Sequence, residues 1–123
     1  DNEKTINELV ELVNAQKPDL IVFTGDLVNQ RSCELEGFQD ILVQLHAKDG
    51  VYSILGNHDY GSYYHWKNLK EQVNNIDNLI RMQKTMGWKL LNLFVRLVLS
   101  RITLRLITQR YHCNFRPCPE AER

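Results

Sequence analysis

Apolar residues along the chain form two short runs, residues 20–23 and 51–55, and three longer stretches with helical spacing. Both short runs are rich in β-branched or aromatic residues and are followed closely by glycine, which is typical of buried strands that end in tight loops. Between them, residues 34–46 place five apolar side chains on one face of a predicted helix: Leu35, Phe38, Ile41, Leu42 and Leu45. A strand, a helix and a strand with short connections predict parallel pairing and a right-handed crossover, and therefore an α/β fold.

The other two helical patterns flank this unit. Thr5 and Glu8 have the spacing of a capping box, which predicts a helix with Thr5 as its N-cap. Its apolar stripe consists of Ile6, Leu9, Val10 and Val13. A third helix is predicted from about residue 67 to 86, ended by Gly87 and followed by a strand near residues 88–91. Its expected inward-facing residues are Leu69, Val73, Ile76 and Ile80.

Polar side chains follow both predicted strands directly. Asp26 comes after the first strand, and Asn57, His58 and Asp59 come after the second. Because ligands bind at the carboxyl ends of strands in open α/β sheets, both loops are expected to face one crevice. Singly, Asp26 is as well explained by a turn cap and Asn57 by a left-handed turn; together they favour a site. The aromatic residues 60–66 either line the mouth of this crevice or pack beneath a surface loop.

Two segments carry a resemblance to a known family, the calcineurin-like metallophosphoesterases. They are Thr24-Gly25-Asp26-Leu27-Val28-Asn29 and Leu55-Gly56-Asn57-His58-Asp59. The spacing of one helix and one strand between them also fits that family. The resemblance covers roughly the first two thirds of the chain and implies a layered α/β fold, of which this chain holds an incomplete part. It also implies hydrolysis of phosphate esters, either phosphomonoesters or phosphodiesters, at a pair of divalent metal ions (Mn, Fe, Zn or Mg).

The resemblance assigns roles residue by residue. Asp26 is the expected bridge between the two metal ions, and Asn57 the expected ligand of one of them through its side-chain oxygen. His58 is the expected proton donor to the leaving group, or a group that stabilises charge on the phosphoryl oxygens. Many relatives have an Asp at the position of Asn29 to orient this histidine. Here Asn29 is expected to accept the hydrogen bond instead. Asp59 either contributes to this site or caps its loop.

Other parts of the family pattern have no counterpart here. The family opens with Asp-x-His on its first strand and later adds a lone histidine and Gly-His-x-His, whereas this chain opens with Asp-Asn-Glu and contains no Gly-His-x-His. Two matched ligands cannot hold two metal ions, so we expect the chain to be an incomplete and inactive part of a phosphoesterase. One alternative is a non-catalytic α/β binding module that retains the scaffold, and metal content distinguishes it from the enzyme. A second is a basic-tailed interaction protein that uses Arg96, Arg101, Arg105 and Arg110, which salt-dependent binding of polyanions would reveal.

Charge divides the chain into two parts. Residues 1–91 carry nine Lys and Arg against thirteen Asp and Glu, whereas residues 92–123 carry six Arg and no Lys against two Glu. We interpret residues 1–91 as a partial phosphoesterase domain and residues 92–123 as a basic tail, either frameshifted or a divergent extension. The balanced total charge of the 123 residues gives no indication of nucleic-acid binding. No run of about 18 apolar residues is present, so no spanning helix is expected within this sequence. The location is left open between the cytoplasm and a membrane reached through a missing N-terminal segment.

Overall fold

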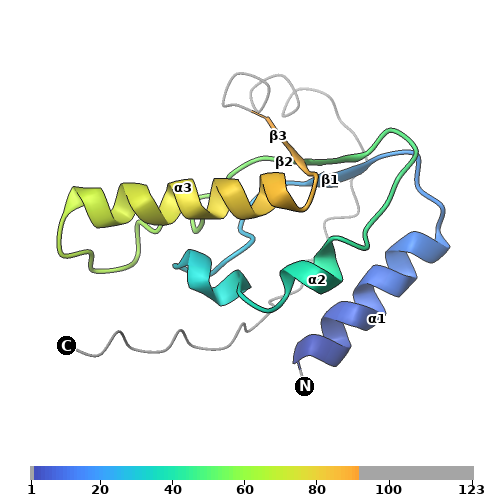
Figure 1. Cartoon of the computed structure of the whole chain (residues 1–123), viewed down its shortest axis with the longest axis horizontal. Coiled ribbons are helices and arrows are strands. Elements are labelled where there is room, and N and C mark those ends of the chain that lie inside the picture. Colours follow the sequence, from blue (N-terminus) through green and yellow to red (C-terminus); the bar gives the residue numbers. More distant parts are fainter. Residues whose placement is uncertain (1, 92–123) are drawn as a thin grey trace.

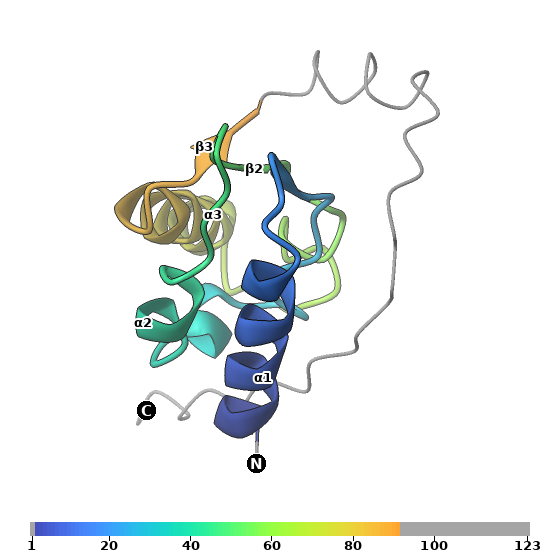
Figure 2. The same ribbon diagram turned by 90° about the vertical axis from the view of Figure 1, so that its right-hand side faces the viewer.

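A computed structural model of the chain describes residues 2–91, and these form a three-stranded parallel sheet with helices on one side (Figures 1 and 2). The strands are β1 (Ile21–Phe23), β2 (Val51–Ser53) and β3 (Lys89–Leu90), in the order β1-β2-β3. Ile21 pairs with Val51 and Phe23 with Ser53, so the predicted parallel pairing of the first two strands is confirmed. The strand predicted near residues 88–91 is also present, parallel to β2.

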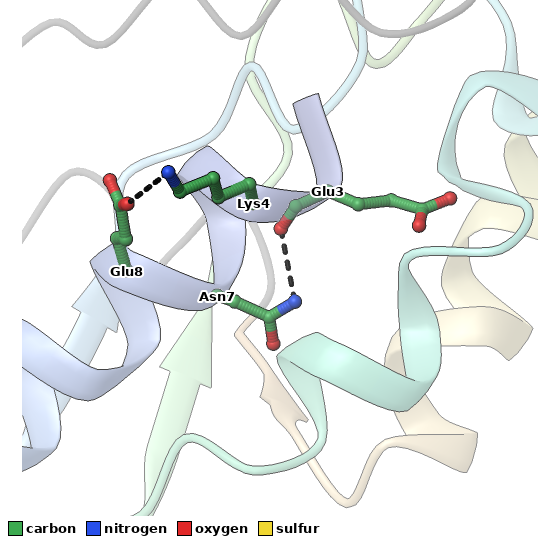
Figure 3. Close-up of polar contacts among 4 residues, drawn as sticks. All are labelled: Glu3, Lys4, Asn7 and Glu8. Carbon is green, nitrogen blue, oxygen red and sulfur yellow. Dashed lines mark hydrogen bonds and ion pairs between the residues drawn. The ribbon is translucent and has the colours of Figure 1, made fainter. Parts of the chain in front are cut away.

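Helix α1 (Asn2–Ala15) packs against α2 (Gln39–Leu42). The predicted N-cap at Thr5 is wrong, because Thr5 lies inside the helix. Within the first turns the side-chain Nδ2 of Asn7 donates to the backbone carbonyl of Glu3 at 3.1 Å (Figure 3). The Lys4 ammonium pairs with the Glu8 carboxylate at 3.8 Å. Both partners of that ion pair are largely exposed, so it adds little stability. The predicted stripe is confirmed, since Ile6 and Val10 are buried and Leu9 and Val13 are half-buried.

The single helix predicted over residues 34–46 is wrong. Two short helices replace it: the 3₁₀ helix η1 (Ser32–Leu35) and α2. Glu36 is extended and Gly37 has a φ of 84°, a left-handed conformation that glycine adopts without a steric penalty. The break turns the chain but keeps the apolar residues inward, since Leu35, Phe38, Leu42 and Leu45 remain buried.

Helix α3 (Leu69–Thr85) lies on the same side of the sheet and packs against β3 and η1 (Figure 2). Asn68 caps it by accepting a hydrogen bond from the Glu71 amide at 2.9 Å. The predicted helix is therefore confirmed, but not all of its predicted inward face. Leu69 and Val73 are exposed, and Ile76 and Ile80 are only half-buried. The buried α3 residues are Leu79, Met82 and Gln83.

The core lies between the sheet and the helices. Its buried apolar residues are Ile6, Val10, Leu27, Val28, Leu35, Phe38, Leu42, Leu45, Val51, Leu79, Met82, Met86 and Trp88. Leu27 and Val28 belong to the first candidate loop, so burial of their side chains anchors that loop. Among residues 2–91 no helix is long and apolar enough to cross a membrane. The interpretation of residues 92–123 as a basic tail lies outside the described residues.

Candidate metal and phosphate site

The two candidate loops meet where β1 and β2 end. The Ile54 amide continues the strand pairing by donating to the Phe23 carbonyl at 3.0 Å, after which both chains turn into the loops. The backbone amide of His58 donates to Asp26 Oδ1 at 3.0 Å. The Asp26 side chain and the backbone of the Asn57–His58 loop therefore lie together, as parallel strands predict.

The buried side chain of Asp59 holds the two loops together by hydrogen bonds. Its side chain is fully buried, and its carboxylate accepts four backbone N–H groups. Oδ2 accepts from Asp26 and Gly56, both at 2.8 Å. Oδ1 accepts from Leu27 at 2.8 Å and from Val28 at 3.2 Å. Since three of these donors belong to the first loop and one to the second, Asp59 fixes the position of each loop relative to the other.

Burial destabilises the ionised form of the Asp59 carboxyl, and the four backbone N–H donors stabilise it. Burial raises the pKa of the Asp59 carboxyl above its ordinary value of 3.8, while the backbone N–H groups of Gly56, Val28, Asp26 and Leu27 lower it. Burial is the larger effect, because removing a carboxylate from water disfavours its ionised form. Asp59 is thus a structural carboxylate beneath the site and is not exposed to a bound ligand.

The backbones of the two loops approach so closely that only glycine fits at Gly56. A Cβ placed there would overlap the side chain and backbone nitrogen of Asp26. Asp26 itself has a φ of 59°, a left-handed conformation that is uncommon for a residue with a side chain. Two hydrogen bonds hold this residue in place, since its backbone N–H donates to Asp59 and its side chain accepts from the His58 N–H. Local backbone strain of this kind is characteristic of functional sites.

His58 is oriented by the main chain of Asn29. Nδ1 of the imidazole lies 2.7 Å from the Asn29 carbonyl oxygen. Because a carbonyl can only accept, Nδ1 must carry the proton of this bond, and Nε2 remains to hold or release a proton. Asn29 thus accepts the expected hydrogen bond from His58. The acceptor is its backbone oxygen, which is available whatever side chain stands at position 29.

Glu34 holds the segment that contains Asn29. Its carboxylate accepts the backbone N–H groups of Asn29, Gln30 and Arg31 at 2.8–3.0 Å. From the sequence Glu34 was expected only as part of a helix, because Arg31, three residues earlier, is not one of the Ser, Thr, Asp or Asn residues that mark a capping box. Glu34 therefore supports the carbonyl that orients His58.

The aromatic residues 60–66 were expected either to line the mouth of the crevice or to pack beneath a surface loop, and different residues do each. Tyr63 lies at the site: its hydroxyl accepts from Asn57 Nδ2 at 2.9 Å, and its ring centroid is 4.8 Å from that of His58. Trp66 instead packs against Tyr64, and its indole N–H donates to the Gly61 carbonyl at 2.7 Å. The sequence had not singled out Tyr63.

Asp26 and Asn57 are both exposed and supply oxygen atoms of the kind that bind hard divalent cations. Among residues 2–91, however, no group of three or more His, Cys, Asp or Glu side chains is arranged to hold a metal ion. Asp26 and Asn57 are therefore candidate ligands only, and they are two oxygen-bearing side chains that the loops bring to this edge of the sheet.

Comparison with known proteins agrees with this geometry. The family model of the calcineurin-like phosphoesterases matches residues 1–115, a range that includes both loops. The chain belongs to the calcineurin-like phosphoesterase family. No solved structure matches the chain significantly.

Three curated relatives show what share of a family member's length is matched by this chain. A metallophosphoesterase of Caenorhabditis elegans is 39% identical over 71 residues, which are 56% of this chain and 15% of that protein. UDP-2,3-diacylglucosamine pyrophosphatase of Chlamydia trachomatis is 42% identical over 52 residues, 42% of this chain and 16% of that protein. A transmembrane protein with a metallophosphoesterase domain of Danio rerio is 34% identical over 55 residues, 45% and 13% respectively. The matched segments thus span about a sixth of these relatives or less.

Proposed function

We propose that this chain is the central strand–helix–strand part of a metal-dependent phosphoesterase, and that the intact protein hydrolyses a phosphomonoester or a phosphodiester. The observation that carries the proposal is the meeting of the two loops at the ends of β1 and β2. This places the Asp26 carboxylate beside the loop that contains Asn57 and His58. Family membership supports the reaction class.

Asp26 and Asn57 are the proposed metal ligands. Two divalent cations (Mn, Fe, Zn or Mg) would neutralise charge on the phosphoryl oxygens and lower the pKa of a bound water. Asp26 suits the shared position because one carboxylate can contact both cations and reduce their mutual repulsion. The remaining ligands lie outside residues 2–91. The 123-residue chain is therefore expected to be inactive by itself.

His58 is the proposed proton donor to the leaving oxygen. With Nδ1–H bonded to the Asn29 carbonyl, Nε2 is the atom that can transfer a proton. Asn29 acts through its backbone, so its proposed role is to orient His58 and not to contact the substrate.

The domain boundary is also part of the proposal. We assign residues 1–91 to the phosphoesterase domain and residues 92–123 to a basic tail, although the family match continues to residue 115. The coding DNA tests this assignment: an upstream Asp-x-His and a Gly-His-x-His in a shifted downstream frame would support it. Flanks that lack both motifs would contradict the fragment interpretation and favour the non-catalytic module.

The catalytic roles can be separated in the full-length protein. Asp26→Asn should reduce both metal content and turnover, because the charge that offsets two cations is lost. His58→Asn should leave the metal content unchanged and lower kcat, by about 10²–10⁴-fold for alkyl phosphates and by less for aryl phosphates. Acidic leaving groups need less help from a proton donor. The exposed His65 provides the control variant His65→Asn.

Two results would contradict these assignments. Equal losses for aryl and alkyl phosphates on His58→Asn would argue against proton donation. Loss of metal on the same substitution would make His58 a ligand and the ligand assignment wrong.

A further inference from the structure

The side chain of Asn57 has a specific partner beyond the two motif loops. Its Nδ2 donates to the hydroxyl of Tyr63 at 2.9 Å. Tyr63 lies six positions further along the chain, in the aromatic segment that follows the second loop. Its ring centroid is 4.8 Å from the His58 ring, with the two planes inclined at 40°. One tyrosine thus contacts both the proposed ligand and the proposed proton donor.

The chemistry of an amide side chain gives this contact a consequence. Asn57 can bind a cation only through Oδ1, because Nδ2 carries two hydrogens and no available lone pair. Oδ1 and Nδ2 leave the same carbon in different directions. A partner that engages Nδ2 therefore also determines where Oδ1 points, and an unpartnered exposed amide would be free to rotate.

We propose that Tyr63 is a positioning residue, which selects the orientation of Asn57 in which the amide oxygen is available to a divalent cation. This inference rests on the proposed function of the site. Partners of metal ligands commonly act this way, by fixing ligand orientation without touching the metal. Tyr63 lies outside both motif loops, and its hydroxyl orients a side chain that belongs to one of them.

The neighbouring tyrosines do not make this contact. Tyr60 contributes its backbone carbonyl, which accepts from Gln72. Tyr64 packs against Trp66, and the Arg31 guanidinium lies 5.0 Å from its ring centroid. Tyr63 is 59% exposed and so is not needed to fill the core. Removing only its hydroxyl should leave the fold intact, and Tyr60→Phe is a matched control.

The first experiment uses the 123-residue chain without metal. Side-chain amide NMR should show a shift of the Asn57 Nδ2 protons and faster exchange with water in Tyr63→Phe, because the hydrogen bond is lost. Tyr60→Phe should leave these resonances unchanged. The Asn7 amide, which donates within α1, is an internal reference. Coincident Asn57 resonances in the wild type and Tyr63→Phe would overturn the proposal.

The second experiment measures the affinity of the full-length protein for Mn²⁺ by the EPR signal of the free ion. Tyr63→Phe should weaken binding by about tenfold at an unchanged melting temperature, the lower end of the range for partners of metal ligands, and Tyr60→Phe should not. If Asp26→Asn weakens binding but Tyr63→Phe matches Tyr60→Phe, the inference about Tyr63 is wrong and the proposed function stands. If Asp26→Asn also leaves the affinity unchanged, the proposed metal site itself is wrong.

Discussion

Removing the buried carboxylate of Asp59 should destabilise the whole fold and not only the site. Asp59→Ala leaves the four backbone donors of Asp26, Leu27, Val28 and Gly56 without their acceptor. The last three hydrogen bonds are buried, and an orphaned buried donor costs about 1–3 kcal/mol. Partial entry of water reduces the sum, so we expect a loss of roughly 3–5 kcal/mol.

Asp59→Asn should cost less, about 2–3 kcal/mol, since one oxygen still accepts while the new NH₂ group faces a pair of N–H donors. The exposed Asp77 on α3 gives a matched control, and Asp77→Ala should change stability by less than about 0.5 kcal/mol. Urea unfolding followed by circular dichroism measures these differences, provided that the m-value is unchanged.

The result that would refute this reasoning is equal stability of Asp59→Ala and Asp77→Ala. It would mean that the four N–H groups find other acceptors or water at no cost. A loss of about 4 kcal/mol would be a large share of the 5–15 kcal/mol that stabilises a typical domain.

Three further predictions concern the same loops. Gly56→Ala should cost about 1–3 kcal/mol in urea unfolding because its Cβ overlaps Asp26, and more than Gly37→Ala, where the added Cβ meets open space and only the positive φ is unfavourable. The 123-residue chain should show no Mn²⁺-dependent turnover of an aryl phosphate; robust turnover abolished by Asp26→Asn would reveal metal ligands in this chain besides Asp26 and Asn57. Because the pKa of Asp59 is raised, the folded chain binds this proton more tightly than the unfolded chain. The contribution of Asp59 to the free energy of unfolding should be full below pH 3.8 and should decline as the pH rises through the folded pKa, a trend that urea titrations at several pH values measure and that Asp59→Asn removes.

The parallel unit and the meeting of the two loops could be predicted because they depend on local patterns. The apolar run before Gly25 and the run before Gly56 each form a strand, and a short crossover leaves parallel pairing as the expected arrangement. Once the strands are parallel, the residues that follow them must meet at one edge. This is why the sequence could locate Asp26 and Asn57 without any knowledge of packing.

The errors arose where tertiary contacts override the local pattern. Gly37 breaks the predicted middle helix although the apolar spacing continues through it. On α3, the buried Gln83 accepts a hydrogen bond from the Ser53 hydroxyl, so a polar residue takes an inward position while the apolar Leu69 is exposed. Periodicity alone cannot identify such a pair, because its members belong to different elements.

The same limit applies within the site. Asp59 is three residues from Gly56 in the sequence, which is compatible with a loop cap, but its bonds to Leu27 and Val28 span 32 and 31 positions. The contact between His58 and Asn29 uses a carbonyl, and every residue carries one. The sequence therefore located the loops but not the hydrogen bonds that hold them together.

The bond between Asp59 and the Asp26 amide also bears on the order in which the protein forms. During synthesis, the three backbone N–H donors of the first loop emerge before their acceptor Asp59, which lies 31–33 positions further along the chain. These amides stay hydrated until β1 and β2 pair, and parallel pairing is a slow, non-local event. The loops should accordingly become ordered late in folding. Substitutions at Asp59 should then speed unfolding more than they slow folding, so that the lifetime of the native state, and not its rate of formation, depends on this carboxylate.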